Sequence, residues 1–186
     1  MDVEVKLLVV GAAVSLVATM IGFLGQTFIQ YLISNKGKVK FYIKKVYNKA
    51  NGLPYGFIKD DGDTIFLVPI WIEFHNTKEK REIVRNVNLQ VYNKGKNISN
   101  MVQISHIKET AYANNGAYSF ILEPLTISKF DLQFVLKKSE VDEDFDEVRI
   151  SYYDSKDKYH ERKIIDIDNS WENKTYSIDK DWILIK

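Results

Sequence analysis

The chain has 186 residues, a formal net charge of +1, 13% aromatic residues and no cysteine. The absence of cysteine excludes disulfides, thiolate catalysis and cysteine metal ligands, and the near-neutral charge argues against a nucleic-acid partner. Beyond an apolar N-terminal stretch, about 150 residues remain, which suits one domain with a sizeable core.

The apolar stretch is residues 7–33, LLVVGAAVSLVATMIGFLGQTFIQYLI, which contain no charged side chain. As a helix it would measure roughly 40 Å, against about 30 Å for the hydrocarbon core of a bilayer, so we expect one transmembrane helix. A cleaved signal peptide is the first alternative, but the apolar run continues for fifteen residues past the small-residue site at 16–18. A buried core helix is the second, but the stretch lacks a polar face over its first turns.

Flanking cations predict the direction of this helix. Only Lys6 precedes it, whereas several lysines follow it closely. Because Lys and Arg resist translocation, we expect a single-pass protein of the cell membrane with its N-terminus outside and its C-terminal domain in the cytoplasm. The same lysines are candidates for contact with anionic lipid, although their role as topology signals explains more. They are Lys36, Lys38, Lys40, Lys44 and Lys45.

Small and polar residues recur along the helix at spacings of three and four, so they share one face. Small residues let another helix approach closely, and glutamines can hydrogen-bond across such an interface. One interpretation is self-association or docking on another membrane protein. The other is that small residues are common in single spans and that the glutamines lie near the headgroups. The face consists of Gly11, Ser15, Ala18, Gly22, Gln26 and Gln30.

The first part of the soluble chain predicts two strands around a loop. Residues 39–48 alternate between apolar and polar side chains, as a strand does. Residues 51–63 are rich in Gly, Pro and Asp, which predicts a loop, and their carboxylates are better explained by a solvated turn than by a calcium site. Residues 64–76 are apolar on both faces and predict a central strand. Pro69 is unexpected there, because proline favours an edge or a bulge.

A polar turn at 76–82 leads to a strand over 83–93. Its pattern is that of an antiparallel strand with one wet face, in which Ile83 and Val87 belong to the inward series and Asn86 to the solvent face. Further strands are predicted at 101–108, 118–123, 130–136, 148–152 and 159–165, with a polar break at 109–116 and a last strand or packed segment near 182–185.

About seven short strands joined by polar turns predict an antiparallel β-sandwich of immunoglobulin-like kind. A barrel is the less favoured alternative. In strand rhythm the chain resembles the immunoglobulin class, whose cysteine pair it lacks, and this resemblance implies nothing about activity. The expected division is a transmembrane anchor with flanks over residues 1–36 and a soluble domain over residues 37–186.

Catalytic and metal-binding patterns are absent from the sequence. His75, His106 and His160 lie on separate predicted strands or turns without ligand spacing, and no glycine-rich phosphate loop occurs. We therefore expect neither a cofactor nor a metal, and no enzyme, although an active site can assemble from distant strands.

The densest charge lies in residues 140–147, EVDEDFDE. Such a run is usually a solvated loop. The functional alternative is a docking loop for a basic partner or a loose calcium site. Its carboxylates are Glu140, Asp142, Glu143, Asp144, Asp146 and Glu147.

Two functions from different classes fit these features. The first is a non-catalytic interaction module held at the membrane, with a protein partner or self-association. The second is a ligand-sensing membrane effector that acts through self-association of its helix, with a ligand that the sequence does not identify.

Overall fold

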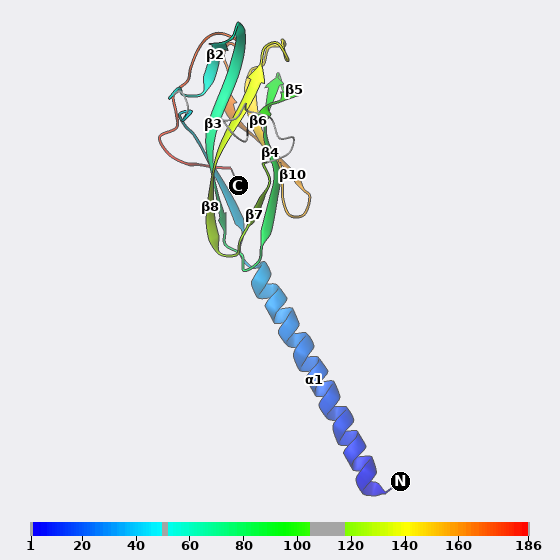
Figure 1. The fold of residues 1–186 in the computed structure, drawn as a ribbon. Coiled ribbons are helices and arrows are strands. Elements are labelled where there is room, and N and C mark those ends of the chain that lie inside the picture. Colours follow the sequence, from blue (N-terminus) through cyan, green and yellow to red (C-terminus); the bar gives the residue numbers. More distant parts are fainter. Residues whose placement is uncertain (1, 50–51, 105–117, 186) are drawn as a thin grey trace.

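The computed structural model describes residues 2–49, 52–104 and 118–185 (Figure 1). It begins with one long helix, α1 (Val3–Asn35), none of whose residues is buried. By length and composition α1 is apolar enough to cross a membrane, a criterion that a signal sequence near an N-terminus also meets. The rest of the described chain is mostly β-structure in two antiparallel sheets. The prediction of an antiparallel β domain after an apolar helix is therefore confirmed.

The first sheet has the strand order β11–β1–β3–β8–β6, with β2 also paired to β3. Its strands are β1 (Val39–Lys45), β2 (Gly56–Asp60), β3 (Asp63–Asn76), β6 (Val102–Ile104), β8 (Thr126–Lys137) and β11 (Ile183–Leu184). Asn76 at the end of β3 pairs with Val39 and with Thr126. Thus β3 ends, and β1 and β8 begin, at the edge of the domain next to α1, which we call the helix end; the opposite edge is the far end (Figure 1).

The second sheet has the order β10–β9–β4–β5, with β7 paired to the start of β4. Its strands are β4 (Glu82–Asn93), β5 (Lys96–Asn100), β7 (Phe120–Leu122), β9 (Glu147–Tyr153) and β10 (Tyr159–Asp166). The turn over residues 77–81 carries the chain from β3 into β4, and Glu82 pairs with Leu122. The second sheet therefore also has strand ends at the helix end.

Both sheets contribute to one hydrophobic cluster. The rings of Phe41 and Phe74 in the first sheet have centroids 4.5 Å apart, and Phe41 meets Tyr152 of β9 edge-on at 5.1 Å. Burial of each such ring contributes about 1.5–3 kcal/mol. In β3 the residues 66–70 are all buried, in keeping with the central position predicted for this strand.

Pro69 is accommodated by a change of partner strand. β1 pairs with β3 up to Ile70, and β2 pairs with it from Leu67, so Pro69 lies between the two registers. Its carbonyl accepts from the N–H of Val46 on that same side. In an antiparallel sheet the N–H and the carbonyl of one residue point toward the same neighbouring strand. The N–H that Pro69 lacks would therefore point away from β8, and the hydrogen bonds between β3 and β8 stay intact.

Two strands lie where the sequence predicted no strand. β2 falls within the predicted loop 51–63, and β5 lies between the predicted strands 83–93 and 101–108. The five residues of β2 are too few to show an alternation. Their pairing with β3 through the turn at Asp61 and Gly62, together with full burial of Phe57, makes them a strand. The loop prediction was wrong for these residues because tertiary pairing overrode local composition.

Ile83 was also placed on the wrong face. It is 48% exposed, whereas Val84 is 3% exposed and belongs to the core. The register of β4 against β9 shifts between Arg85 and Asn88, and Asn86 has a φ of 52°. This bulge inserts one residue, so the alternation valid from Val87 onward is reversed before it.

Candidate functional site: the junction between helix and sheets

The chain leaves α1 through a glycine. Gly37 has a φ of 104°, and a Cβ there would lie 2.4 Å from the carbonyl oxygen of Thr77. Only glycine fits both the backbone conformation and the space. This close approach sets the end of α1 directly against the turn over residues 77–81.

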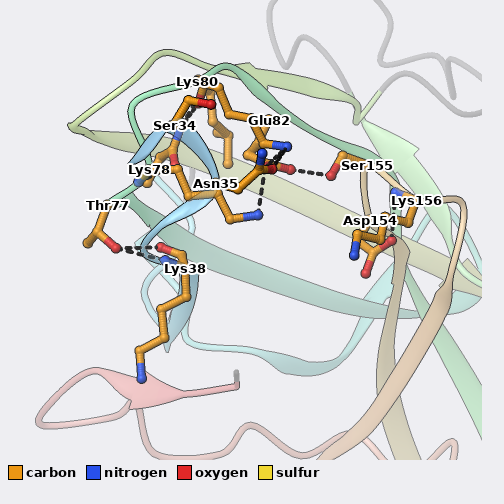
Figure 2. A network of polar contacts seen from close by, with 12 residues as sticks. Ser34, Asn35, Lys38, Thr77, Lys78, Lys80, Glu82, Asp154, Ser155 and Lys156 are labelled. Carbon is orange, nitrogen blue, oxygen red and sulfur yellow. Dashed lines mark hydrogen bonds and ion pairs between the residues drawn. The ribbon is translucent and has the colours of Figure 1, made fainter. Parts of the chain in front are cut away.

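Hydrogen bonds then fasten this turn to the helix (Figure 2). The Thr77 hydroxyl accepts from the Lys38 N–H at 2.9 Å and donates to the Lys38 carbonyl at 2.9 Å. The Lys80 ammonium donates to the Asn35 Oδ1 at 2.6 Å, and the Asn35 amide donates to the Tyr31 carbonyl within α1. The last turn of α1 and the turn between β3 and β4 thus hold each other.

Glu82 links the same turn to the second sheet. Its carboxylate is buried, accepts from the Lys78 ammonium at 2.6 Å and from the Ser155 hydroxyl, and lies 3.7 Å from the Lys80 ammonium (Figure 2). Burial alone would raise the pKa of Glu82. Hydrogen bonds from Lys78 and Ser155 and the charges of the two lysines outweigh that effect and hold the pKa below its ordinary value.

Asn76 completes the junction. Its side chain is 1% exposed, and the amide nitrogen lies 2.9 Å from the carbonyl oxygens of Lys80 and Glu123. The N–H of Leu125 donates to the Lys78 carbonyl at 3.1 Å. The turn between β7 and β8 is therefore part of the same hydrogen-bonded unit.

A Ser, His and Asp come together on the hairpin between β9 and β10. The His160 Nε2 lies 2.8 Å from Asp154 Oδ2, and the Ser155 hydroxyl donates to Glu82. Hydrogen bonds from His160 and from the Lys156 and Lys158 N–H groups overcome burial and lower the pKa of Asp154 to about 2. The adjoining cavity measures about 30 Å³, which holds one water molecule and no larger substrate. His75 instead contacts Glu73 on the first sheet, and His106 lies outside the described residues.

The predicted helix-packing residues are all exposed on α1. No atom of the described domain lies within 4 Å of a Cβ built at Gly11 or Gly22. The C-terminal half of this face forms an open hollow together with Glu79 from the turn over residues 77–81. The surface expected to pack against another helix is thus uncovered in the described chain: Gly11, Ser15, Ala18, Gly22, Gln26 and Gln30.

The predicted juxtamembrane lysines separate into two groups. Lys36 and Lys38 lie at the helix end, whereas Lys44 and Lys45 lie about 20 Å farther along β1, with Lys40 between them. The Lys44 ammonium donates to the Lys180 carbonyl at 2.8 Å. Lys45 is buried and pairs with Asp179 at 3.0 Å. The geometry therefore leaves Lys36 and Lys38 as the members of this set near the end of α1.

The acidic loop lies at the far end, after the last residues of β8. The Asp144 carboxylate accepts from Ser170, Asp146 accepts from the Lys94 N–H, and Glu147 pairs with Arg149. Glu143 contributes its carbonyl to the Trp171 indole N–H. Glu140 and Asp142 are exposed, with Lys138 at 4.0 Å from Asp142.

Sequence reasoning missed the cations of the turn over residues 77–81, which are Lys78, Lys80 and Arg81. A signal for them existed. The strand that follows the apolar helix starts beside the end of that helix, so an antiparallel partner such as β3 must end there. The turn after β3 then lies at the same level.

Among the described residues, no group of three or more His, Asp or Glu side chains is placed to hold a metal ion. Comparison with protein-family models and with curated proteins finds no match for this chain.

Proposed function

We propose that this chain is a single-pass membrane protein whose cytoplasmic domain, an immunoglobulin-like β-sandwich, serves as a non-catalytic interaction module. The observation that carries the proposal is α1 itself, 33 residues long and without a buried residue. Its Leu, Ile and Phe side chains would each cost about 1.5–3 kcal/mol in water, which a lipid environment removes.

The junction supports a fixed orientation of the β domain relative to α1. The last turn of α1 is hydrogen-bonded to the turn over residues 77–81, and Glu82 joins that turn to the second sheet. The far end, with Glu140 and Asp142, is then directed away from the bilayer and is available to a basic protein partner.

Labelling of single cysteines tests both anchoring and direction, because the natural chain contains no cysteine. Lys94→Cys lies in the β4–β5 turn at the far end, and Asp2→Cys lies before α1. In intact cells an impermeant maleimide should label Asp2→Cys and should reach Lys94→Cys only after lysis. Labelling of Lys94→Cys from outside would reverse the orientation, and loss of α1 from the mature chain would identify a signal sequence.

A second candidate function is a ligand-sensing effector that acts through association of α1. It is favoured by an open groove of about 510 Å³ on the first sheet, lined in part by Lys44, Tyr47 and Trp71. The hydrogen-bonded junction would pass a movement of the sheets to the helix. An effector should alter membrane permeability when its signal is present and lose that effect in Gly22→Leu. An unchanged effect would remove the helix-packing mechanism.

A further inference from the structure

Large apolar side chains are exposed at the helix end of the domain. Ile121 is 65% exposed, Leu125 is 67% exposed and Ile127 is 60% exposed. They come from β7, from the turn that follows it and from the start of β8, and Figure 1 places this turn beside the end of α1. Exposed leucine and isoleucine side chains at the end of the domain that adjoins α1 indicate an interaction surface there.

Leu125 is the most informative of the three. Its φ of 53° is a conformation that glycine or asparagine adopts readily and leucine does not. It follows Pro124 in a turn closed by the hydrogen bond from the Thr126 hydroxyl to the Glu123 carbonyl. Neither the backbone nor core packing explains a leucine here, because the side chain projects from the tip of the turn.

The position of this tip relative to α1 is set by two hydrogen bonds. The Lys80 ammonium lies 2.6 Å from Asn35 Oδ1 at the last turn of the helix, and the Leu125 N–H lies 3.1 Å from the Lys78 carbonyl. The headgroup layer of a bilayer is about 5–8 Å thick on each side. If α1 spans the membrane up to its last apolar residues, the tip therefore lies at the level of that layer.

Cations surround the same level. The turn over residues 77–81 carries Lys78 and Lys80, which lie near Glu82, and Arg81, which pairs with Glu123. Lys36 and Lys38 follow α1. Basic residues at this height favour anionic headgroups, whereas exposed apolar side chains favour the boundary between headgroups and acyl chains. The five cations outnumber the neighbouring carboxylates, Glu79, Glu82 and Glu123, so this edge keeps a positive charge that favours an anionic lipid surface over a second copy of itself.

We infer that Ile121, Leu125 and Ile127 insert into the headgroup–acyl boundary of the membrane that α1 spans, while the neighbouring cations contact anionic headgroups. The inference rests on the proposed function, since it needs α1 in the bilayer. The domain is then held at the membrane by two attachments, the helix and this apolar tip, and it lies against the surface in one orientation.

Fluorescence quenching in vesicles tests this inference on the full chain. Leu125→Cys is labelled with an environment-sensitive fluorophore and reconstituted in phosphatidylcholine vesicles that contain a minority of phosphatidylserine. Brominated lipids serve as the quencher. We expect a blue-shifted emission that the brominated lipids quench.

Two further positions make the outcome decisive. Lys94→Cys is the matched control, because Lys94 also has a positive φ, 48°, in a turn at the far end, and it should stay unquenched. Ala18→Cys reports on α1 and should be strongly quenched. Quenching at 18 without quenching at 125 overturns the inference alone, whereas no quenching at 18 overturns the proposed function. A blue-shifted emission from the label at position 125 that persists in detergent and grows with protein concentration would show that the tip mediates self-association. That result would also overturn the inference.

A second variant separates lipid contact from a structural role. Leu125→Asn suits the positive φ and should leave the thermal unfolding midpoint in detergent unchanged or raised. In a chain labelled at Ile127→Cys, it should reduce quenching by brominated lipids. A lower unfolding midpoint with unchanged quenching would show that Leu125 acts in folding and not at the bilayer.

Discussion

Gly37 is the single residue on which the exit from α1 depends most. Replacement by alanine forces a side chain into a left-handed backbone conformation and places its Cβ 2.4 Å from the Thr77 carbonyl oxygen. We expect Gly37→Ala to lower the free energy of unfolding of the domain by more than the roughly 1–2 kcal/mol that the left-handed conformation alone costs an alanine. Chemical unfolding of the full chain in detergent measures this change.

Gly62 provides the matched control for that substitution. Its φ is 85°, similar to that of Gly37, but no atom lies within 4 Å of a Cβ built on it. Gly62→Ala should therefore show the backbone cost alone. If both substitutions lower the free energy of unfolding equally, Thr77 moves away from the new Cβ at position 37 without an energetic cost.

Glu82 should make the stability of the domain depend on pH. Its pKa is lowered in the folded state from 4.5, so its stabilising contribution is complete above that pH and is lost as the pH falls through the folded value. We expect Glu82→Gln to cost about 1–3 kcal/mol at neutral pH, because the donors Lys78 and Ser155 lose a charged acceptor at this buried position. The difference from the parent should shrink below pH 4.5 in urea unfolding measured over a pH series.

Glu123→Gln is the control for this pH dependence. Glu123 pairs with Arg81 at 2.9 Å, but both side chains are more than half exposed. An exposed pair contributes about 0–1 kcal/mol. A pH-independent loss in Glu82→Gln would indicate that packing, and not the charge of Glu82, stabilises the junction.

At the scale of the element, the uncovered small-residue face of α1 makes a prediction about assembly. Replacing Ala18 and Gly22 together by leucine should separate two packed backbones and weaken association in a bilayer by on the order of 1 kcal/mol or more. The β domain should fold as before, because α1 has no residue buried against it. Energy transfer between labelled helices measures the association.

Leucine at Val17 and Met20, on another face of α1, is the matched control. Lipid accepts leucine as readily as valine or methionine, so this variant should associate like the parent. If both double variants associate equally well, the small-residue face is incidental and any partner binds the β domain.

At the scale of the whole molecule, the junction should limit the swing of the domain relative to α1. Thr77→Val together with Lys80→Met removes the side-chain bonds to Lys38 and Asn35. We expect a broader distance distribution between spin labels at Ile29→Cys and Lys94→Cys, with little change in the thermal unfolding midpoint. Thr64→Val, at the start of β3 and the far end, should leave the distribution unchanged. Equal widths in all three proteins would show that the chain connection and Gly37 alone set the angle.

Several features of the fold were predictable because they depend on local order in the sequence. The uncharged run at 7–33 predicts α1 as a helix that is not packed on the domain, since its first turns lack the polar face that a surface helix turns to water. Alternation in β3, β8 and β9 determines their strand character and most of their core residues. The antiparallel class follows from short strands and polar turns.

Tertiary structure decided what local order does not encode. β2 became a strand by pairing with β3, and a one-residue bulge at Asn86 reversed the faces of β4 before it. Lys45, one of the predicted juxtamembrane lysines, is buried in a pair with Asp179, which is distant in sequence. The candidate site was likewise hidden, because Asn35, Lys80 and Glu82 meet only when antiparallel strands return the chain to the end of α1. A sequence reveals periodicity over a few residues, whereas pairing partners, bulges and junctions depend on contacts between segments that only folding brings together.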